Sequence, residues 1–287
     1  MDGDLIAVTG ASGYVGSIIV AAVGSDWPVR ALVRSPRQPA DIGWSLSDSE
    51  EQMLAKLSGR GIGHLIHAAW DMTSSDPAEI ERTCVEGTRR LLSAARRAGI
   101  ARLALISTVS AFADARSVYG RAKYRTETIA ASYGASVLRL GLVYGPEAGG
   151  LFGNLRRQVR TSQFIPLIGD GKLPQYLLPA ATLADVVQRA ARGELDGLTE
   201  PLTLANPEPV PLRHLIEAVA AEAGRQVRLV PVPWRILYVL LRAAELAGLR
   251  LPARSDGVIS YVRQAPALDF SVMERLGIRP PAFALAS

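Results

Sequence analysis

A tyrosine and a lysine stand four residues apart in the segment YGRAK, residues 119–123. On a helix this spacing puts both side chains on one face, so the phenol of Tyr119 and the ammonium of Lys123 can converge on one substrate atom. A close cation favours the phenolate, and we expect Lys123 to lower the pKa of Tyr119 from its usual value of about 10. Tyr119 is therefore a candidate for proton exchange with a carbonyl or an alcohol.

Two neighbouring hydroxyl residues, Ser107 and Thr108, close an apolar segment that begins at residue 101 and has the composition of a strand. Open parallel sheets bind their ligands at the carboxyl ends of the strands. Either hydroxyl can hydrogen-bond a substrate oxygen while Tyr119 moves the proton.

Glycines stand at positions 10, 13 and 16 of the segment VTGASGYVG, between an apolar run and the helical pattern SIIVAAV. Glycine accepts φ > 0 and lets another backbone or a ligand come close. The free N–H groups and the positive dipole end at the start of a helix suit a pyrophosphate. The spacing differs from G-x-G-x-x-G, but the strand–turn–helix context is that of a dinucleotide site. The alternative is a tight turn with close helix packing.

The end of the second strand indicates which dinucleotide binds. A carboxylate there accepts from the ribose hydroxyls of NAD, whereas the 2′-phosphate of NADP needs a cation. The strand at 28–33 is followed by Arg34, with no acidic residue before Asp41. This favours NADP over NAD, with a solvated surface role for Arg34 as the alternative.

These residues require a scaffold, and the chain predicts a doubly wound α/β fold with a parallel sheet covered on both faces. After residue 145 the regular alternation fades, and proline becomes frequent between 166 and 281. We expect a dinucleotide-binding domain at 1–145, to which 182–205 returns, and a smaller substrate-binding part at 146–181 and 206–287. A capping box at Thr182 and Asp185 is expected to start a helix. The expected strands are 4–9, 28–33, 64–69, 101–107 and 135–140, and the expected helices are 14–24, 49–59, 77–99, 119–134, 182–193, 212–224 and 233–248.

The composition argues against several other classes of protein. The 287 residues are 48% hydrophobic, and the net charge of +5 comes mostly from arginines spread along the chain, which argues against a nucleic-acid partner. No uncharged apolar run reaches the roughly 18 residues of a spanning helix, and the MDGD start does not resemble a secretory signal. We therefore expect a cytoplasmic protein with a small-molecule substrate and no membrane partner, and a homodimer is an open alternative. One cysteine and three scattered histidines leave no disulfide and no zinc site, so no metal is expected.

Six segments together resemble an extended short-chain dehydrogenase/reductase, the group that includes the NAD-dependent epimerase/dehydratases: TGASGYVG, HLIHAAW, CVEGTRRLL, ISTVSAF, YGRAK and LRLGLVYGP. The resemblance covers about residues 5–205. It implies that Tyr119 and Lys123 perform proton transfer and ribose binding, and that Thr108 is the catalytic hydroxyl. It further implies cofactor contacts at Gly10, Ser12, Gly13, Tyr14, Val15, Gly16, His67, Ala68, Ala69, Ser107 and Leu142, in addition to Arg34.

Departures from the family pattern narrow the range of reactions and substrates that we expect for this chain. Val109 and Ser110 stand where related sugar dehydratases have Asp-Glu, so a dehydratase of that type is not expected. Gln175 replaces an arginine that nucleotide-sugar enzymes direct at the diphosphate, and Cys84 replaces an asparagine near the site.

We expect an NAD(P)-dependent oxidoreductase that moves hydride between nicotinamide C4 and a secondary alcohol or ketone. The alternatives are a nucleotide-sugar epimerase or reductase with a divergent diphosphate site, and a non-catalytic NADP-binding redox sensor. In the first of these, Arg156, Arg157 or Arg160 could compensate for the lost arginine, although a solvated helix face is the expected place of these three side chains.

Overall fold

A parallel sheet of seven strands forms the centre of the computed structural model, which describes residues 5–74, 76–146, 149–249, 251 and 253–285. The strand order is β11-β6-β5-β4-β1-β2-β3, so the chain runs outward from β1 in both directions. This arrangement confirms the predicted doubly wound fold. A ligand crevice is expected where the order reverses, at the carboxyl ends of β1 and β4. The strands are β1 (Leu5–Thr9), β2 (Val29–Val33), β3 (Ile42–Gly43), β4 (Ile62–His67), β5 (Arg102–Thr108), β6 (Ser136–Leu140) and β11 (Leu202–Leu204).

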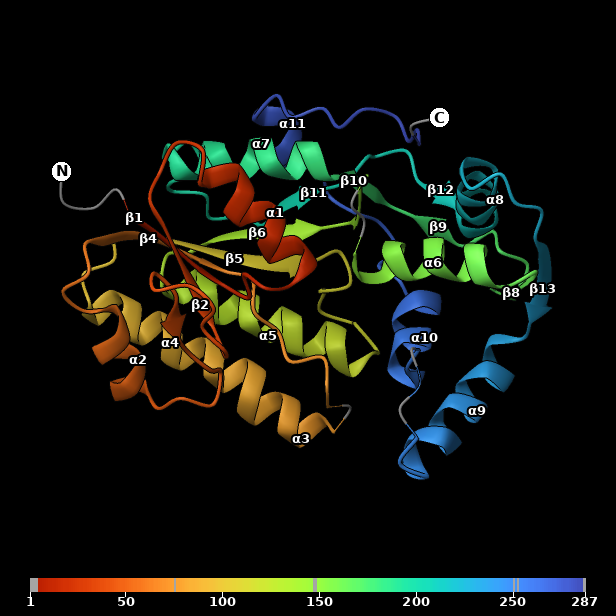
Figure 1. Cartoon of the computed structure of the whole chain (residues 1–287), viewed down its shortest axis with the longest axis horizontal. Coiled ribbons are helices and arrows are strands. Elements are labelled where there is room, and N and C mark those ends of the chain that lie inside the picture. Colours follow the sequence, from red (N-terminus) through yellow and green to blue (C-terminus); the bar gives the residue numbers. More distant parts are fainter. Residues whose placement is uncertain (1–4, 75, 147–148, 250, 252, 286–287) are drawn as a thin grey trace.

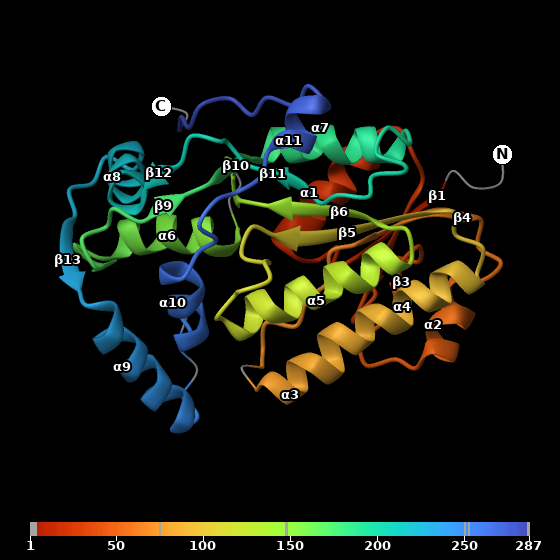
Figure 2. The ribbon, with the colours of Figure 1, turned by 180° about the vertical axis from the view of Figure 1, so that it is seen from behind.

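Two layers of helices cover the sheet, as Figures 1 and 2 show. Neighbouring residues of one strand point to opposite faces, so Ala7 joins one hydrophobic core while Ile6 and Val8 join the other. Helices α1 (Tyr14–Val23) and α7 (Ala180–Ala191) pack together on the second of these faces. The first face carries α2 (Glu50–Leu57), α3 (Pro77–Ile80), the π-helical turn η1 (Glu81–Val85), α4 (Glu86–Arg97) and α5 (Val118–Ser132).

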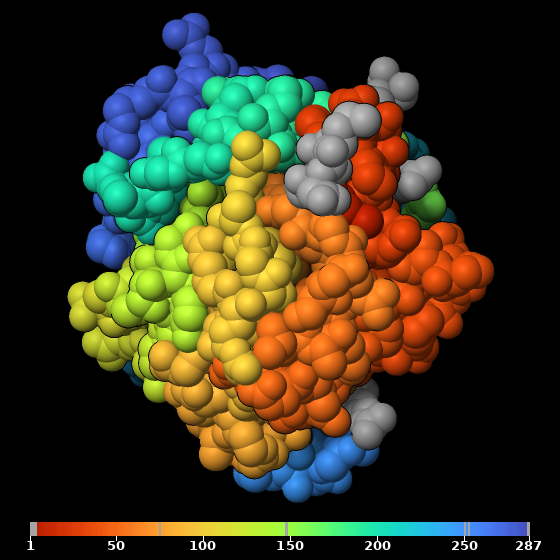
Figure 3. Space-filling view, turned by 90° about the vertical axis from the view of Figure 1, so that its left-hand side faces the viewer, coloured from red at the N-terminus to blue at the C-terminus, as the bar shows by residue number. Residues whose placement is uncertain are grey.

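The remaining elements gather at one end of the sheet (Figure 1) around a third hydrophobic core. Strand β7 pairs with β10 and β8 pairs with β13, both parallel, whereas β9 pairs antiparallel with β12. Figure 3 shows the opposite end of the molecule, where segments of the N-terminal half form most of the surface. Light-blue atoms from the region of α9 and α10 are visible at the bottom of this view. These elements are β7 (Leu142–Tyr144), α6 (Gly150–Thr161), β8 (Phe164–Ile168), β9 (Pro174–Gln175), β10 (Leu177–Pro179), β12 (Val210–Pro211), α8 (Leu212–Glu222), β13 (Arg228–Val232), α9 (Trp234–Leu246) and α10 (Ser255–Val262). Helix α11 (Ser271–Arg275) instead packs beside β11, where its Val272 and Met273 join the second core.

Two local expectations are wrong. Helix α7 begins at Ala180 with Pro179 as N-cap and no side-chain cap, so Thr182 lies inside the first turn. The cause is that β10 ends at Pro179, whose fixed φ of −60° leads directly into the helix. The helix expected at 77–99 is interrupted by η1, a π-helical turn of the kind that often marks functional sites.

The segment 182–205, which was expected to return to the sheet, contains most of α7 and the edge strand β11 beside β6. The division of the chain into two parts stays a prediction. Within the described ranges, no helix has the length and apolar character needed to cross a membrane. The same ranges contain no group of three or more potential metal ligands.

Candidate active site

The glycine turn joins β1 to α1, and its three glycines have different tasks. Gly10 has φ = +69°, and a Cβ there would lie 2.7 Å from the backbone nitrogen of Ala69. A Cβ at Gly16 would lie only 2.0 Å from the carbonyl oxygen of Gly10. Close packing therefore explains Gly10 and Gly16, which was the alternative interpretation of the motif.

Gly13 instead marks the place for a ligand. A Cβ there would meet nothing nearer than the Gly10 oxygen at 3.3 Å. Gly13 is the N-cap of α1, and no side chain caps that helix. The first N–H groups of α1 are therefore free to donate to an anion, as the diphosphate of a dinucleotide requires.

Three further predicted cofactor residues surround this turn. Ser12 is exposed beside Gly13, and Val15 packs on the core beneath α1. The ring of Tyr14 faces the loop after β7, since a Cβ at Gly149 would lie 3.0 Å from that ring. Tyr14 can thus offer its backbone N–H to a diphosphate, while its side chain packs against the neighbouring loop.

A buried histidine at the end of β4, His67, connects the end of β1 to helix α4 through hydrogen bonds. Thr88 Oγ1 donates to the carbonyl of Cys84 in η1 (2.7 Å), so it accepts from Nε2–H of His67 (3.0 Å). Nδ1 of His67 therefore carries no proton and accepts from Thr9 Oγ1 (2.6 Å). Burial, assisted by the charge of Lys123, lowers the pKa of His67 to about 3, so the imidazole is neutral.

The same threonine fixes the segment predicted to line the cofactor. Thr9 Oγ1 accepts from the backbone N–H groups of Ala68 (3.1 Å) and Ala69 (3.2 Å). These residues pass directly over Gly10. The carboxyl ends of β1 and β4 are thereby locked together at the point where the strand order reverses.

The end of β2 presents an exposed cation. Arg34 follows Val33 and makes no ion pair within 4.0 Å in the described part of the chain, although its charge contributes to lowering the pKa of Asp71. Asp41 closes its own turn by accepting from the backbone N–H groups of Arg37 (2.8 Å) and Gln38 (3.0 Å). The acidic residue that could have served NAD is therefore occupied, which fits a 2′-phosphate at Arg34.

Tyr119 and Lys123 lie in the first two turns of α5. Burial raises the pKa of Tyr119 to about 12, although a hydrogen bond with Thr108 acts in the opposite direction. The expectation of a lowered pKa is thus wrong for the free protein, because burial removes water from the phenol and Lys123 is not among the groups that lower the pKa of Tyr119. The phenol is protonated at neutral pH and can donate its proton.

Lys123 is buried, and its Nζ donates to the carbonyl of Ile106 (3.1 Å). Burial lowers the pKa of Lys123 to about 8, opposed by Cys84 and Glu127. The indole of Trp70 contacts both residues, with Lys123 Nζ 4.3 Å from its ring centroid and the centroid of the Tyr119 ring at 5.6 Å in an edge-on contact. No role was predicted for Trp70, although it directly follows the predicted cofactor segment.

Ser107 and Leu142 point away from this group. The Ser107 hydroxyl donates to buried Glu127 at 2.5 Å, and Arg139 holds that carboxylate with two further nitrogens. Leu142 begins β7 and packs against the third core. Neither side chain meets Tyr119, so of the two adjacent hydroxyls only Thr108 joins the catalytic pair.

The catalytic helix begins at the N-cap Ser117, whose hydroxyl accepts from the N–H of Gly120 (3.0 Å), and sequence reasoning missed a second group that holds this start. Asp256 of α10 accepts from the backbone N–H groups of Val118 (2.7 Å) and Tyr119 (3.0 Å). Glu245 of α9 holds α10 in a similar way, accepting from the N–H (2.8 Å) and hydroxyl (2.7 Å) of Ser255. Two carboxylate caps therefore connect α9 through α10 to α5.

Gly120 brings the active-site loop close to the catalytic helix. A Cβ at this position would lie 2.5 Å from the carbonyl oxygen of Ser110. The loop between Thr108 and Tyr119 thus rests directly on α5.

Gln175 and Arg156 are engaged away from a nucleotide diphosphate, whereas Arg157 and Arg160 lie exposed on α6, as expected for a solvated helix face. Gln175 donates its amide to the neighbouring carbonyl of Pro174 (2.6 Å). Arg156, expected on a solvated helix face, instead forms a half-buried bidentate pair with Glu222 (2.9 and 2.5 Å). Arg156 is therefore committed to the third core and is not free for a nucleotide diphosphate.

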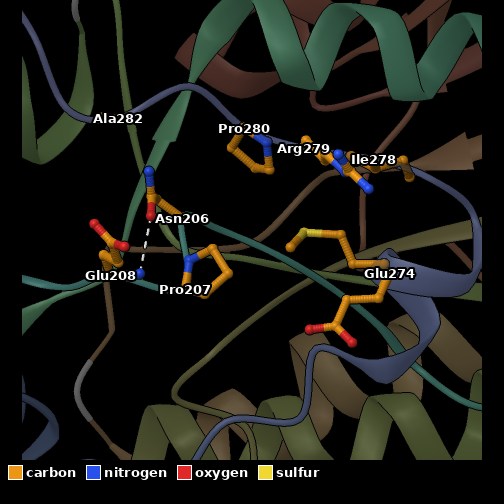
Figure 4. A pocket seen from close by; sticks show the side chains of 9 residues that line it. Asn206, Pro207, Glu208, Glu274, Ile278, Arg279, Pro280 and Ala282 are labelled. Atoms are coloured by element: carbon orange, nitrogen blue, oxygen red, sulfur yellow. Dashed lines mark hydrogen bonds between the residues drawn. The ribbon is translucent and has the colours of Figure 1, made fainter.

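Two sizeable hollows lie away from this site. One, of about 560 Å³, lies between the segment after β11 and the C-terminal segment, and Figure 4 shows Asn206 accepting there from the N–H of Glu208 (2.8 Å). The other, of about 590 Å³, is lined by residues that precede β4 and β5, at the amino edge of the sheet. Neither includes a residue of the glycine turn or of the catalytic pair.

Comparisons with a family model, with related sequences and with solved structures agree with one another. The model of the NAD-dependent epimerase/dehydratase family matches residues 6–173. A ceramide reductase of Caulobacter vibrioides is 32% identical over 162 residues, 52% of this chain, and the match spans 50% of that protein. A 4-hydroxy-2-methyl-3-oxo-4-farnesyl-3,4-dihydroquinoline-1-oxide ketoreductase of Stigmatella aurantiaca is 27% identical, covering 94% of this chain and 90% of its own length. The structure of a Thermus thermophilus UDP-glucose 4-epimerase in complex with NAD has a TM-score of 0.67 at 20% identity, covering 90% of this chain and 98% of that one.

Proposed function

The chain belongs to the NAD-dependent epimerase/dehydratase family, within the extended short-chain dehydrogenase/reductases, and from that premise we propose that it is an NADP(H)-dependent reductase of a ketone in a small apolar molecule. The proposal rests on Tyr119, Lys123 and Thr108, which lie at or after the end of β5, at the same carboxyl edge of the sheet as the uncapped start of α1. The coenzyme, when bound, supplies hydride to the carbonyl carbon. A cytoplasmic location, where such coenzymes circulate, goes with this activity.

Each side chain of the group receives one task. Thr108 holds the carbonyl oxygen together with Tyr119, and the phenol gives its proton to that oxygen. Lys123 binds the ribose next to the nicotinamide and stabilises the phenolate that forms. A phenol that is protonated at neutral pH supports reduction rather than alcohol oxidation, because oxidation would first need the phenolate.

The choice of NADP rests on Arg34 and on the occupied state of Asp41. The family as a whole binds NAD, so the preference for the phosphorylated coenzyme is a proposal of its own. Replacing Arg34 by Ala removes a charge-assisted contact of roughly 1.5–3 kcal/mol, so NADPH should bind about ten- to a hundredfold more weakly while NADH binding stays the same. Arg37→Ala, three residues later, is the matched control. Equal loss for both coenzymes, or no loss, contradicts the assignment.

An apolar substrate is supported by two observations. Gln175 and Arg156, two of the residues considered for a nucleotide diphosphate, are turned to other partners. Two relatives are named for reductions of a ceramide and of a farnesylated quinoline oxide, both of which carry long apolar chains. A UDP-sugar epimerase is the second candidate, because the fold is shared with such an enzyme.

The test is NADPH oxidation with a panel of apolar ketones and, separately, with UDP-sugars. We expect turnover with a ketone, no change in thermal stability with UDP-sugars, and no turnover by Tyr119→Phe although it still binds NADPH. A large stabilisation by a UDP-sugar would favour the epimerase. A Tyr119→Phe protein that reduces the ketone normally would refute the role of the phenol, and failure of every substrate would favour a non-catalytic redox sensor.

A further inference from the structure

Helix α9 exposes an apolar face that nothing in the described chain covers. Leu241 is the one buried residue of its thirteen, whereas α8, which is shorter by two residues, buries four. The exposed side chains recur at helical spacing and continue into the turn that follows, as α9 projects from the small part of the molecule (Figure 1). They are Ile236, Val239, Leu240, Leu246, Leu249 and Leu251, and they keep between 47% and 75% of their surface accessible.

The stretch of chain that contains α9, residues 224–254, accounts for the whole positive net charge of the protein. Residues 224–254 include six arginines and one glutamate, and the rest of the chain has 26 basic and 26 acidic residues. Arg235 and Arg242 are exposed two turns apart, on one border of the apolar stripe. Glu245 is held by Ser255 and Arg242 and is largely covered. The surface of α9 is thus apolar and positively charged.

We propose that α9 lies on the surface of a membrane that contains anionic lipids. An amphipathic helix with leucines on one face and arginines at its border buries the apolar side chains at the acyl boundary, while the arginines meet lipid phosphates. A second copy of this chain fits less well, since two-fold symmetry would set this positive surface against itself. Nucleic acid fits less well too, because phosphates give no reason to expose six large apolar side chains. This proposal departs from the expectation of no membrane partner, because the lack of a spanning helix among the described residues does not bear on a helix that lies flat.

Docking through α9 would place the active site next to the lipid. Glu245 caps α10 at Ser255, and Asp256 of α10 caps the catalytic helix at Tyr119. The helix on the membrane is therefore separated from the catalytic tyrosine by one short helix. The inference stands on α9 and does not depend on which ketone is reduced.

The experiment is co-sedimentation of the full chain with vesicles of phosphatidylcholine alone or with a third phosphatidylglycerol. We expect binding to the anionic vesicles, weaker binding at high salt, and little binding to the neutral ones. Leu240→Glu with Leu246→Glu should abolish binding. Arg235→Gln with Arg242→Gln should weaken it about 30-fold, because each arginine near an anionic surface contributes roughly fivefold.

Matched controls lie on another helix. Leu151→Glu removes an equally exposed leucine from α6, and Arg157→Gln with Arg160→Gln removes two exposed arginines there; both proteins should bind as the wild type does. Far-ultraviolet circular dichroism and NADPH binding verify that each variant is folded. Failure of the wild type to bind anionic vesicles would overturn the proposal, as would equal loss in α6 and α9 variants. A dimer in solution that Leu240→Glu dissociates would assign the face to a second copy instead.

Discussion

The cap that Asp256 places on the catalytic helix gives a prediction whose magnitude follows from the contacts. Its carboxylate accepts from two backbone N–H groups, at Val118 and Tyr119, and opposes the positive end of the α5 dipole. Hydrogen bonds to a charged group contribute about 1.5–3 kcal/mol each, but these residues are half-buried and water can replace part of the contact. We expect Asp256→Ala to lower the free energy of unfolding by about 2 kcal/mol, and Asp256→Asn, which keeps one acceptor, by about half as much.

The effect on catalysis should exceed the effect on binding. Without the cap the first turn of α5 can shift, and Tyr119 lies in that turn, so the phenol no longer meets the carbonyl oxygen in one geometry. A displacement of this kind typically costs ten- to a hundredfold in rate. We expect kcat of NADPH-dependent ketone reduction to fall by that factor in Asp256→Ala, KM to change little, and Asp256→Asn to lie between.

Urea unfolding and steady-state kinetics measure the two effects on the same preparations. Asp269→Ala is the control, because Asp269 accepts from the N–H of Ser271 (2.9 Å) at the start of α11 and not from the first turn of α5. It should lose stability and keep kcat. If Asp256→Ala lost as much stability as the control and kept its kcat within twofold, the cap would be structural only and the reasoning would be refuted.

Three other perturbations test separate parts of the site. Thr9→Val leaves buried Nδ1 of His67 without its donor and should cost about 2–4 kcal/mol in urea unfolding, with Thr9→Ser close to wild type. Since Lys123 has a pKa of about 8 and acts in its charged form, kcat/KM of reduction should fall above that pH, and Lys123→Arg should move the fall to higher pH; an unchanged profile would exclude Lys123 as its origin. Linkage gives the opposite sign for stability, which should rise between pH 8 and about 10.4, where the unfolded chain binds the extra proton. Gly16→Ala places a Cβ 2.0 Å from a backbone oxygen and should prevent soluble expression, whereas Gly13→Ala should fold.

Much of the sheet could be predicted because apolar runs and helical periodicity record burial directly. The run expected at 28–33 forms β2 at Val29–Val33, and the one expected at 135–140 forms β6 at Ser136–Leu140. The short strands of the small part could not be predicted, because they contain two to five residues and pair across long distances, as β8 does with β13. No local pattern records such a pairing.

The candidate site shows the same division. Tyr119 and Lys123 were proposed from their spacing and Ser107 or Thr108 from the end of β5, whereas only the family resemblance selected Thr108. The direction in which the pKa of Tyr119 shifts could not be predicted, because the sequence shows a neighbouring lysine but not how far water is excluded from the phenol. The role of Asp256 could not be predicted either, since Asp256 belongs to no motif and caps a helix that begins 138 residues earlier in the chain.

The central claim is that Tyr119 faces a dinucleotide whose diphosphate rests on the start of α1. A crystal structure of the protein with NADP and a ketone analogue tests it most directly. The account predicts the diphosphate on the N–H groups after Gly13, the 2′-phosphate beside Arg34, and the phenol of Tyr119 hydrogen-bonded to the analogue's oxygen. A coenzyme bound away from α1, or a phenol turned from the nicotinamide, would contradict it.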